Sequence, residues 1–517
     1  MDEQDLEDDQ QDFVWDRCLN DQMFVFQDNE LERILDIIIT HVTPQRSPSQ
    51  KPVPANLLFL SARYAHYHAS AELLANLLSG ATDKINDVVE QHQWDMTMLA
   101  FWISNTTLLL HYLKKDPGLL ESTVEFQLHL AELINEIFIL IIRDAERRMN
   151  KVLEAAMLDH ETIPGLEDVH FQNEWKLFRS KSRAKPPPEP AEKRFRPPSP
   201  RRRAEVSPRT ITSLLSSALF VLDLYDVHSV ITTQIIAQLL YWLGAELFNR
   251  ILSTKRYLAR TKAMQIRMNM STLEEWARAT NRQPEHYENG STTCTGESTA
   301  EAARKHLVPV IQLLQWLQCL SSLGDDFGSL VSTLLQLQQL TPAQLLQAAK
   351  SYRPEIGERG LSKAATKFLV NLKRDPDLLY REQWKLEEAQ EFRKKQEEED
   401  ERMEEGKNGE SHPDLEQQQK DQPKMSREKK QESPPPEPPR SPSSTTSGRP
   451  ESWAKAEMEP TSVFLDSSLT LPFSLPTSTD MLISYGAGWG GTNRERARKY
   501  IPTVPPEVLL RFDREAY

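Results

Sequence analysis

The sequence predicts an all-α fold, a multi-helix bundle interrupted by disordered insertions. Two observations lead to this fold class. First, the apolar residues of every long periodic run recur at steps of three and four, which places them on one face of a helix. Second, the 517 residues include 34 prolines and only 38% hydrophobic residues, below the usual range for a fully folded chain. We therefore expect folded helical parts separated by polar tracts.

The central run begins at Gln234, and its apolar residues leave little of a helix surface polar. A helix of that kind is buried in a protein core or in a membrane. The stretch from Val227 to Ala245 carries no Asp, Glu, Lys or Arg, but it contains six polar residues that are costly in lipid. We predict a core helix and no transmembrane span. After it, the spacing of Ser271 and Glu274 is that of a capping box and predicts the start of a second helix.

Between these two helices lies a group of five basic residues within thirteen positions. Charges placed between two buried helices must face water, so we take them as candidate partner-binding residues: Lys255, Arg256, Arg260, Lys262 and Arg267. The alternative interpretation is a solvated basic face with no partner.

The first part of the chain is acidic and then helical. Residues 1–27 are expected to be a disordered N-terminus, and its charge is the opposite of a secretory signal. Residues 28–178 are expected to form a first helical half, in which Pro117 and Gly118 end one helix. Its helices are predicted at residues 31–42, 55–78, 94–115 and 120–158.

A composition break follows at residues 179–209, where eleven Lys or Arg stand against three Glu among many prolines. Such a segment cannot bury enough apolar surface to fold. It is either a spacer or an electrostatic clamp for an acidic partner, an anionic membrane or a nuclear import receptor. Ser199 and Ser207, each followed by proline, are candidate phosphorylation sites that would lower its charge.

Residues 210–405 are expected to form the second helical half, with a charged helical extension at its end. Helices are predicted at residues 300–323, 361–372 and 377–405, and Thr341 with Gln344 makes a capping box for another. Residues 406–460 form a second low-complexity insertion. In residues 461–517 the apolar side chains near the end, such as Ile501 and Phe512, predict a segment that docks back onto the core.

The sequence carries no convincing catalytic or metal-binding motif. Gly486, Gly488 and Gly491 satisfy G-x-G-x-x-G, but too few residues follow for the βαβ unit that a dinucleotide site requires. We therefore expect no enzyme activity, no cofactor and no metal. The net charge of −14 argues against specific nucleic-acid binding. Three scattered cysteines fit a reducing compartment, so a cytoplasmic location is expected.

Several blocks of the chain resemble the dilute domain, the globular cargo-binding tail of class V myosins. That domain also occurs in afadin-type adaptors and in fungal proteins that combine it with ankyrin repeats. The resemblance is carried by AFWISNTTLLLHYLKKD (100–116), LLYWLGAELFNRIL (239–252) and QIRMNMSTLEEWAR (265–278), and later by LVPVIQLLQWLQ, LTPAQLLQAAKSY and YIPTVPPEVLLRFD. It implies an elongated helical bundle of two halves along which the final segment packs.

The resemblance also implies a function, although no motor, coiled coil or ankyrin-like repeat precedes the domain here. It implies a non-enzymatic adaptor that holds partner proteins, linked to vesicle or cytoskeletal trafficking. The partners would be adaptor or cargo peptides, small GTPases or their effectors, at vesicle or cell-cortex membranes with peripheral membrane association. The alternative is a signalling or junction-type adaptor at a membrane, regulated by phosphorylation of the basic linker. Trp102 and Asn105 are motif positions, with Trp102 expected in the core and Asn105 bonded to neighbouring backbone.

Overall fold

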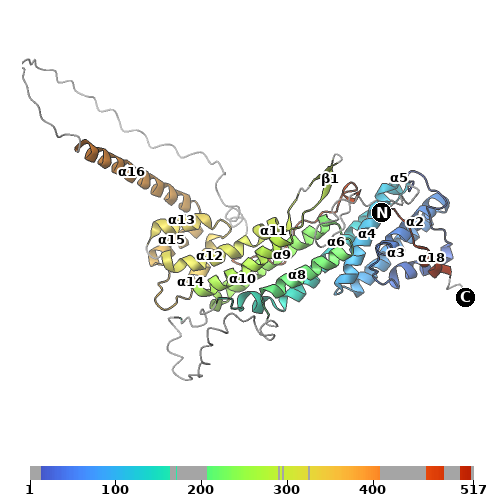
Figure 1. The fold of residues 1–517 in the computed structure, drawn as a ribbon, viewed down its shortest axis with the longest axis horizontal. Helices are drawn as coiled ribbons and strands as arrows, with labels where there is room; N and C mark the ends of the chain where they lie inside the picture. The colour runs from blue at the N-terminus through green and yellow to red at the C-terminus, as the bar shows by residue number, and fades with distance from the viewer. Residues whose placement is uncertain are drawn as a thin grey trace, which may run out of the picture. The chain divides into compact units, whose positions relative to one another are not determined.

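The computed structural model describes residues 13–163, 171, 206–288, 291–293, 296–323, 326–407, 462–482 and 501–513. Helices dominate these residues (Figure 1). Strands occur in one antiparallel hairpin of the described chain, β1 (His286–Glu288) with β2 (Ser291–Thr293), in which His286 pairs with Thr293. The predicted all-α class is confirmed.

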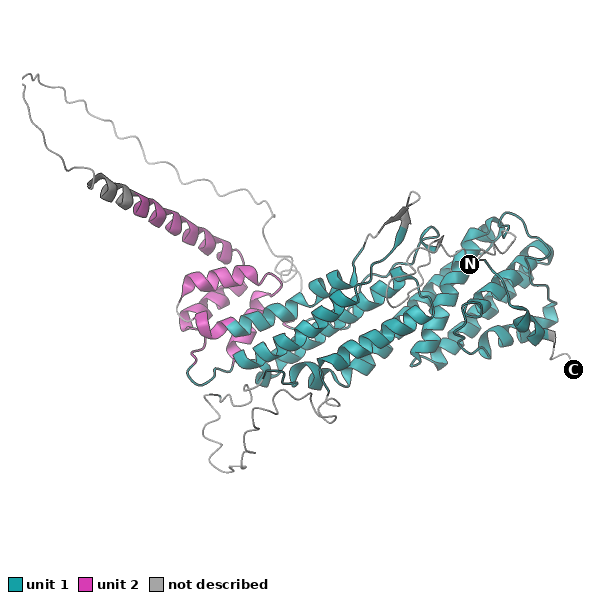
Figure 2. Cartoon of the chain, viewed as in Figure 1, with its two compact units in different colours: residues 1–318, 353–357, 464–517 teal, residues 319–352, 358–463 magenta. Residues whose placement is uncertain are grey.

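The chain divides into two compact units (Figure 2). Unit 1 comprises residues 1–318, 353–357 and 464–517, and unit 2 comprises residues 319–352 and 358–463. Unit 1 thus contains helices from both sides of the basic tract at residues 179–209. From the sequence, these helices are expected to belong to two separate halves. The division falls instead inside α12 (Val308–Leu323).

Unit 1 begins with short helices and continues into long ones. Their bounds are η1 (Asp28–Glu30), α1 (Leu31–Leu35), η2 (Asp36–Thr40), α2 (Val53–His68), α3 (Ala71–Gln91), α4 (Met96–Lys115), α5 (Pro117–Ser122), α6 (Val124–Asn150) and η3 (Glu154–Leu158). The run expected as one helix over residues 55–78 is two helices. Ser70 caps the second, because its side chain accepts a hydrogen bond from the Leu73 amide at 3.1 Å.

The later helices of unit 1 are built around the apolar central run. Their bounds are α8 (Pro208–Leu224), α9 (Ser229–Ser253), η6 (Lys255–Tyr257), α10 (Arg260–Ala279), α11 (Thr299–His306), η7 (Asp480–Leu482) and α18 (Pro506–Asp513). By length and composition α9 could cross a membrane, but 83% of its most apolar window is buried inside the structure. It packs against α6 and α11. At the α11 contact a Cβ on Gly244 would lie 2.3 Å from the His306 carbonyl oxygen, so this close approach requires glycine.

The second central helix starts earlier than the sequence predicts. α10 is continuous from Arg260 to Ala279, and Ser271 lies inside it rather than at its N-cap. The Ser271 hydroxyl donates to the Met268 carbonyl at 2.7 Å, and Glu274 pairs with Arg267 at 2.7 Å. The capping-box prediction is therefore wrong, because the same S-x-x-E spacing also suits two side chains within a helix that bond to earlier residues.

The N-terminal residues from Phe13 are packed where the sequence predicts disorder through residue 27. Phe13 and Trp15 contact the Phe59 ring with centroid separations of 6.1 and 5.6 Å. The fully buried Arg63 guanidinium donates to the carbonyls of Val14 and Arg17 at 3.1 and 2.7 Å. Aromatic anchors and a buried cation thus hold this segment on α2 in spite of its acidic composition.

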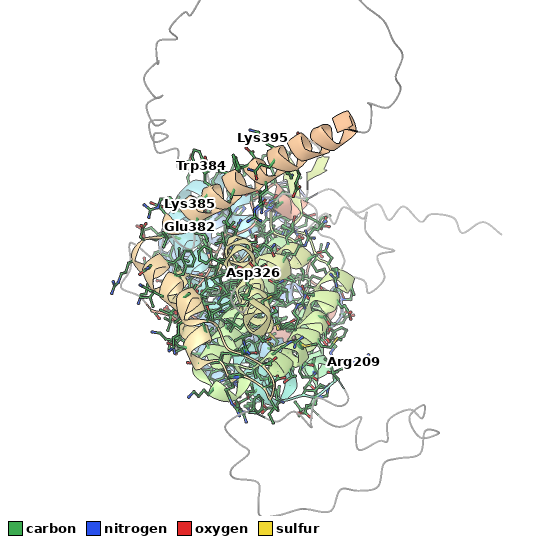
Figure 3. The ribbon with its side chains drawn as sticks, turned by 90° about the vertical axis from the view of Figure 1, so that its left-hand side faces the viewer. Arg209, Asp326, Glu382, Trp384, Lys385 and Lys395 are labelled. Carbon is green, nitrogen blue, oxygen red and sulfur yellow. The ribbon has the colours of Figure 1, made fainter. Side chains whose placement is uncertain are left out.

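In the part of unit 2 that the structure describes, the end of α12 is followed by four further helices. Their bounds are α13 (Phe327–Gln336), α14 (Pro342–Ser351), α15 (Lys363–Arg374) and α16 (Leu378–Lys407). α14 has the capping box expected from Thr341 and Gln344, whereas α13 was not predicted. α16 carries Trp384, Lys385 and Lys395 (Figure 3), and its Trp384 and Phe392 side chains are 59% and 63% exposed.

Candidate partner-binding site

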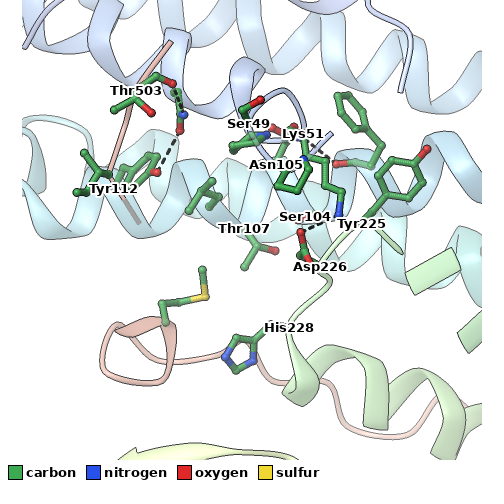
Figure 4. A pocket seen from close by; sticks show the side chains of 17 residues that line it. Ser49, Lys51, Ser104, Asn105, Thr107, Tyr112, Tyr225, Asp226, His228 and Thr503 are labelled. Atoms are coloured by element: carbon green, nitrogen blue, oxygen red, sulfur yellow. Dashed lines mark hydrogen bonds and ion pairs between the residues drawn. The ribbon is translucent and has the colours of Figure 1, made fainter. Parts of the chain in front are cut away.

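A cavity of about 260 Å³ opens in unit 1 beside α2 and α4 (Figure 4). Its walls come from the loop before α2, from α4, from the α8–α9 turn, from η7 and from the C-terminal segment. The lining residues are Pro48, Ser49, Lys51, Pro52, Asn56, Phe101, Ser104, Asn105, Thr107, Leu108, Tyr112, Tyr225, Asp226, His228, Met481, Ile501 and Thr503. The walls combine apolar side chains such as Phe101, Leu108 and Met481 with a larger number of polar ones. A concave site with polar groups held in fixed positions can bind a ligand.

Asn105 fixes the wall of the cavity that is made by the loop before α2. Its amide oxygen accepts from the Ala55 amide at 3.2 Å, and its Nδ2 donates to the carbonyls of Lys51 and Phe101 at 3.1 and 2.9 Å. The side chain is 4% exposed and bonds to backbone, as its position in the sequence block suggests. Asn105 therefore positions the cavity and is not its ligand-binding group. Trp102, on the same helix, is fully buried in the core.

An ion pair closes the side of the cavity toward the α8–α9 turn. Lys51 Nζ lies 3.0 Å from Asp226 Oδ2, and their side chains are 13% and 17% exposed. Asp226 has a φ of +53°, a left-handed conformation that Asp tolerates better than most residues. The two charges lie near enough to the opening to meet a polar ligand group, and together they add no net charge.

The opposite wall joins α2 and α4 to the C-terminal segment. The Tyr112 hydroxyl donates to Asn56 Oδ1 at 3.1 Å, and Asn56 Nδ2 donates to the Thr503 carbonyl at 2.7 Å. α18 is held in addition by Arg33, which donates to the Phe512 carbonyl at 2.9 Å, and by a ring contact between Phe24 and Phe512. Ile501 and Thr503 of the C-terminal segment are thus part of the site, and α18 anchors that segment outside it.

Two histidines near the cavity are neutral at neutral pH. His228 accepts from the Val230 amide at 3.2 Å through Nδ1, so its Nε2 carries the proton and donates to the Asp480 carbonyl at 3.3 Å. Burial lowers the pKa of His228 below its usual value. Burial, helped by Lys115, lowers the pKa of His111 to about 4. Both rings therefore stabilise structure here.

Two hydroxyl groups of the cavity are already engaged within the chain. Thr107 donates to the Ile103 carbonyl at 2.6 Å, and Ser49 lies 3.0 Å from the Ser47 hydroxyl. Over the described ranges, no group of three His, Cys, Asp or Glu residues could hold a metal ion. The arrangement can bind a segment that brings an apolar side chain and one or two polar groups.

The five predicted basic residues do not form one uncompensated patch. Arg256 lies 2.5 Å from Glu154 and 3.2 Å from Asp159, Lys262 lies 3.0 Å from Glu161, and Arg267 is paired with Glu274. Arg260 also has an interaction partner. Lys255 is exposed on the three-residue helix η6. Acidic residues of η3 and the turn after it neutralise much of the expected positive field.

The two candidate phosphorylation sites differ in how much the structure describes. Ser199 lies outside the described residues, as do Gly486, Gly488 and Gly491. Ser207 is the N-cap of α8, where it forms a capping box with Thr210. A phosphate at that position would meet the positive end of the helix dipole, which favours negative charge.

Most of the cavity was not identified from sequence. Lys51 and Asp226 are 175 positions apart, and neither lies in a block with a recognisable pattern. Asn105 is a motif position in the block at residues 100–116, whereas no motif marks the loop before α2. The one signal in the sequence for this cavity is Asn105, a polar residue that follows an apolar helical run.

The fold is a helical bundle with a cavity beside Asn105, and comparisons with known proteins show what the chain is similar to. Residues 234–356 match the model of the DIL domain. A dilute domain-containing protein of Schizosaccharomyces pombe is 37% identical over 355 residues, which is 67% of this chain and 59% of that protein. The chain therefore contains a DIL domain and is similar to dilute domain-containing proteins over about two thirds of its length.

Class V myosins are more distant relatives. Unconventional myosin-Va of Homo sapiens is 26% identical over 319 residues, which is 58% of this chain and 15% of the myosin. The solved structure of a myosin V cargo binding domain is 14% identical, with a TM-score of 0.48, over 68% of this chain and 85% of that domain. The chain spans less than two thirds of the length of these curated relatives.

Proposed function

We propose that the chain is a non-enzymatic dilute-domain adaptor that binds partner proteins, in vesicle or cytoskeletal trafficking, through the cavity beside Asn105. The observation that carries this proposal is the preformed state of that cavity. Three hydrogen bonds of Asn105 and the Tyr112–Asn56–Thr503 chain, all within the chain itself, fix its walls. Binding therefore needs little further ordering of these walls, which lowers one of the costs of association.

The partner that fits is a protein segment with one apolar anchor. A cavity of about 260 Å³ has room for one or two side chains, and its rim offers hydroxyl groups and a neutral ion pair. A large charged ligand would find no excess charge to pair with. The DIL domain and the similarity to dilute domain-containing proteins support the same function, since that domain resembles the cargo-binding tail of class V myosins.

The test fills the cavity with a side chain. Ser104 lines it and is partly exposed, so Ser104→Trp should block it without disturbing the core. The control is Asn135→Trp, which adds the same indole at an exposed position of α6 outside the cavity. The wild type should capture a partner protein that cross-links to its cavity residues. We expect full-length Ser104→Trp to capture at least tenfold less of that partner. Equal capture by the two variants would refute the cavity as the binding site.

A further inference from the structure

The residues from 464 to 476, here called the strap, run along α9 without helical or strand structure of their own. Their chain position is far from α9, with more than 200 residues between the contacting groups. Within unit 1 the strap contacts one polar stripe of α9. The stripe consists of Gln234, Gln238, Tyr241 and Asn249, whose spacing puts them on one helix face.

Each amide side chain of the stripe forms a pair of hydrogen bonds with the strap backbone. Gln234 donates to the Ser474 carbonyl and accepts from the Ser474 amide, both at 2.8 Å. Asn249 does the same with Leu465 at 2.7 and 2.8 Å.

The other two residues of the stripe contact the strap between these two pairs. Gln238 donates to the Leu469 carbonyl at 2.9 Å and accepts from the Leu471 amide at 2.7 Å. The Tyr241 hydroxyl donates to the Asp466 carbonyl at 2.7 Å. The stripe therefore recognises main-chain groups of the strap, and these hydrogen bonds do not depend on the identity of the strap's side chains.

The strap's side chains are held less firmly than its backbone. None of its residues is buried, and Leu469 is 49% exposed. One anchor is specific, because the Phe473 ring stacks on Phe138 of α6 with a centroid separation of 4.2 Å. Main-chain hydrogen bonds with one pocket for a side chain are the mode by which proteins bind extended peptides.

We propose that this stripe and Phe138 form a second binding site, for an extended segment of a partner protein with an aromatic anchor, and that the strap occupies it as an internal ligand. The site uses other residues than the cavity beside Asn105, so it stands whether or not that cavity binds a partner. Because the recognised groups are main-chain groups, a foreign segment can make the same bonds. Its aromatic residue would take the place of Phe473.

Tethering explains why the strap holds the site in the isolated chain. A segment attached to the same chain competes at an effective concentration on the order of mM. A free peptide at about 100 μM should therefore not displace it. Binding by a partner requires that the strap be released or that the partner be concentrated nearby.

The experiment releases the strap while leaving α9 unchanged. Leu471→Pro with Ser474→Pro removes the two amide N–H groups that bond to Gln238 and Gln234. A labelled peptide of residues 462–478 is then titrated onto the full-length chain and followed by fluorescence anisotropy. We expect no binding to wild type up to about 100 μM and a dissociation constant between about 1 and 100 μM for the released variant. Leu469→Ala, which trims an exposed side chain and keeps the backbone, should behave like wild type.

Two further measurements make the result decisive. Adding Gln234→Ala and Gln238→Ala to the released variant should weaken peptide binding at least tenfold, as should N-methylation of the peptide at positions 471 and 474. Hydrogen exchange on the released variant should show fast-exchanging strap amides and protected α9 amides, which would verify that the strap is free and α9 is folded. A released strap with no peptide binding overturns the proposal, as does equal binding of the N-methylated peptide. A dimer that forms through the same glutamines would make a second copy the occupant and overturn the assignment to a foreign partner.

Discussion

Asn105 and His111 are buried polar residues of the same helix, and they meet the cost of burial in different ways. Asn105 uses its oxygen and its Nδ2 group in bonds to backbone, which leaves little unsatisfied. His111, 4% exposed, avoids a buried charge by remaining neutral, with its pKa lowered to about 4. The sequence indicates the role of Asn105 through its helical neighbours. The environment of His111 depends on segments far away in the chain, so it could not be predicted.

The lowered pKa of His111 predicts acid sensitivity. Between about pH 6.5 and pH 4 the unfolded chain binds a proton that the folded chain does not, so the free energy of unfolding falls as the pH falls. From pH 7.5 to pH 5 this loss should be about 2 kcal/mol. His111→Gln should remove that part of the pH dependence, measured by urea unfolding at both pH values. If both proteins lose the same free energy, His111 does not titrate in this way.

At the scale of elements, helix type was predictable and helix boundaries were less so. Apolar periodicity indicates α9 and α14 because burial and capping agree there. Ser271 led to a wrong helix start because a capping box and a pair of residues inside a helix have the same spacing. Whether the residues before Ser271 are helical distinguishes the two cases, and in α10 they are. The break at Ser70 is signalled only by a cap residue within a continuous apolar run. Where two local signals compete, tertiary packing determines the boundary.

The short helix η6 gives a matched pair of charge reversals. Arg256 contacts Glu154 and Asp159, and the Tyr257 hydroxyl donates to the same two carboxylates at 2.9 and 3.0 Å. Arg256→Glu places a third negative charge there and should lower the free energy of unfolding by about 1 kcal/mol, since the exposed pair is screened by solvent. Lys255→Glu should change it by less than about 0.5 kcal/mol. Urea midpoints compare the two, and equal midpoints would show that the Arg256 contacts do not stabilise the chain.

At the scale of the whole molecule, segments remote in sequence meet at one site. The cavity takes residues from positions 48 to 503, and no local pattern indicates which of them come together. The apolar residues of the C-terminal segment did indicate that it docks on the core. They could not indicate where, because Asn56 and Arg33 bond to its backbone and leave no trace in its side-chain pattern.

Removal of the C-terminal segment should therefore destabilise unit 1. Truncation after Asn493 deletes Val508, which is buried, and the groups bonded to Asn56 and Arg33. We expect the melting temperature to fall by several degrees, because the segment contributes more than the loss of about 1 kcal/mol that shifts it by roughly 2–4 °C in domains of about 150–250 residues. The full-length control Leu510→Ala removes a side chain that is 48% exposed and should melt like wild type. An unchanged melting curve after truncation would show that the segment does not stabilise the fold.

The bond between Asn56 and Thr503 also has a consequence for biosynthesis. The two residues are 447 positions apart, and translation at about 5–20 residues per second separates their emergence by roughly 20–90 s. During that interval α2 has left the ribosome, but the segment that covers Asn56 and Arg33 has not been made. Newly made chains thus expose this surface of α1 and α2 for a time long compared with helix formation, which takes microseconds. A chaperone that recognises nascent chains would find its substrate there, at the N-terminal helices, until the last residues are released.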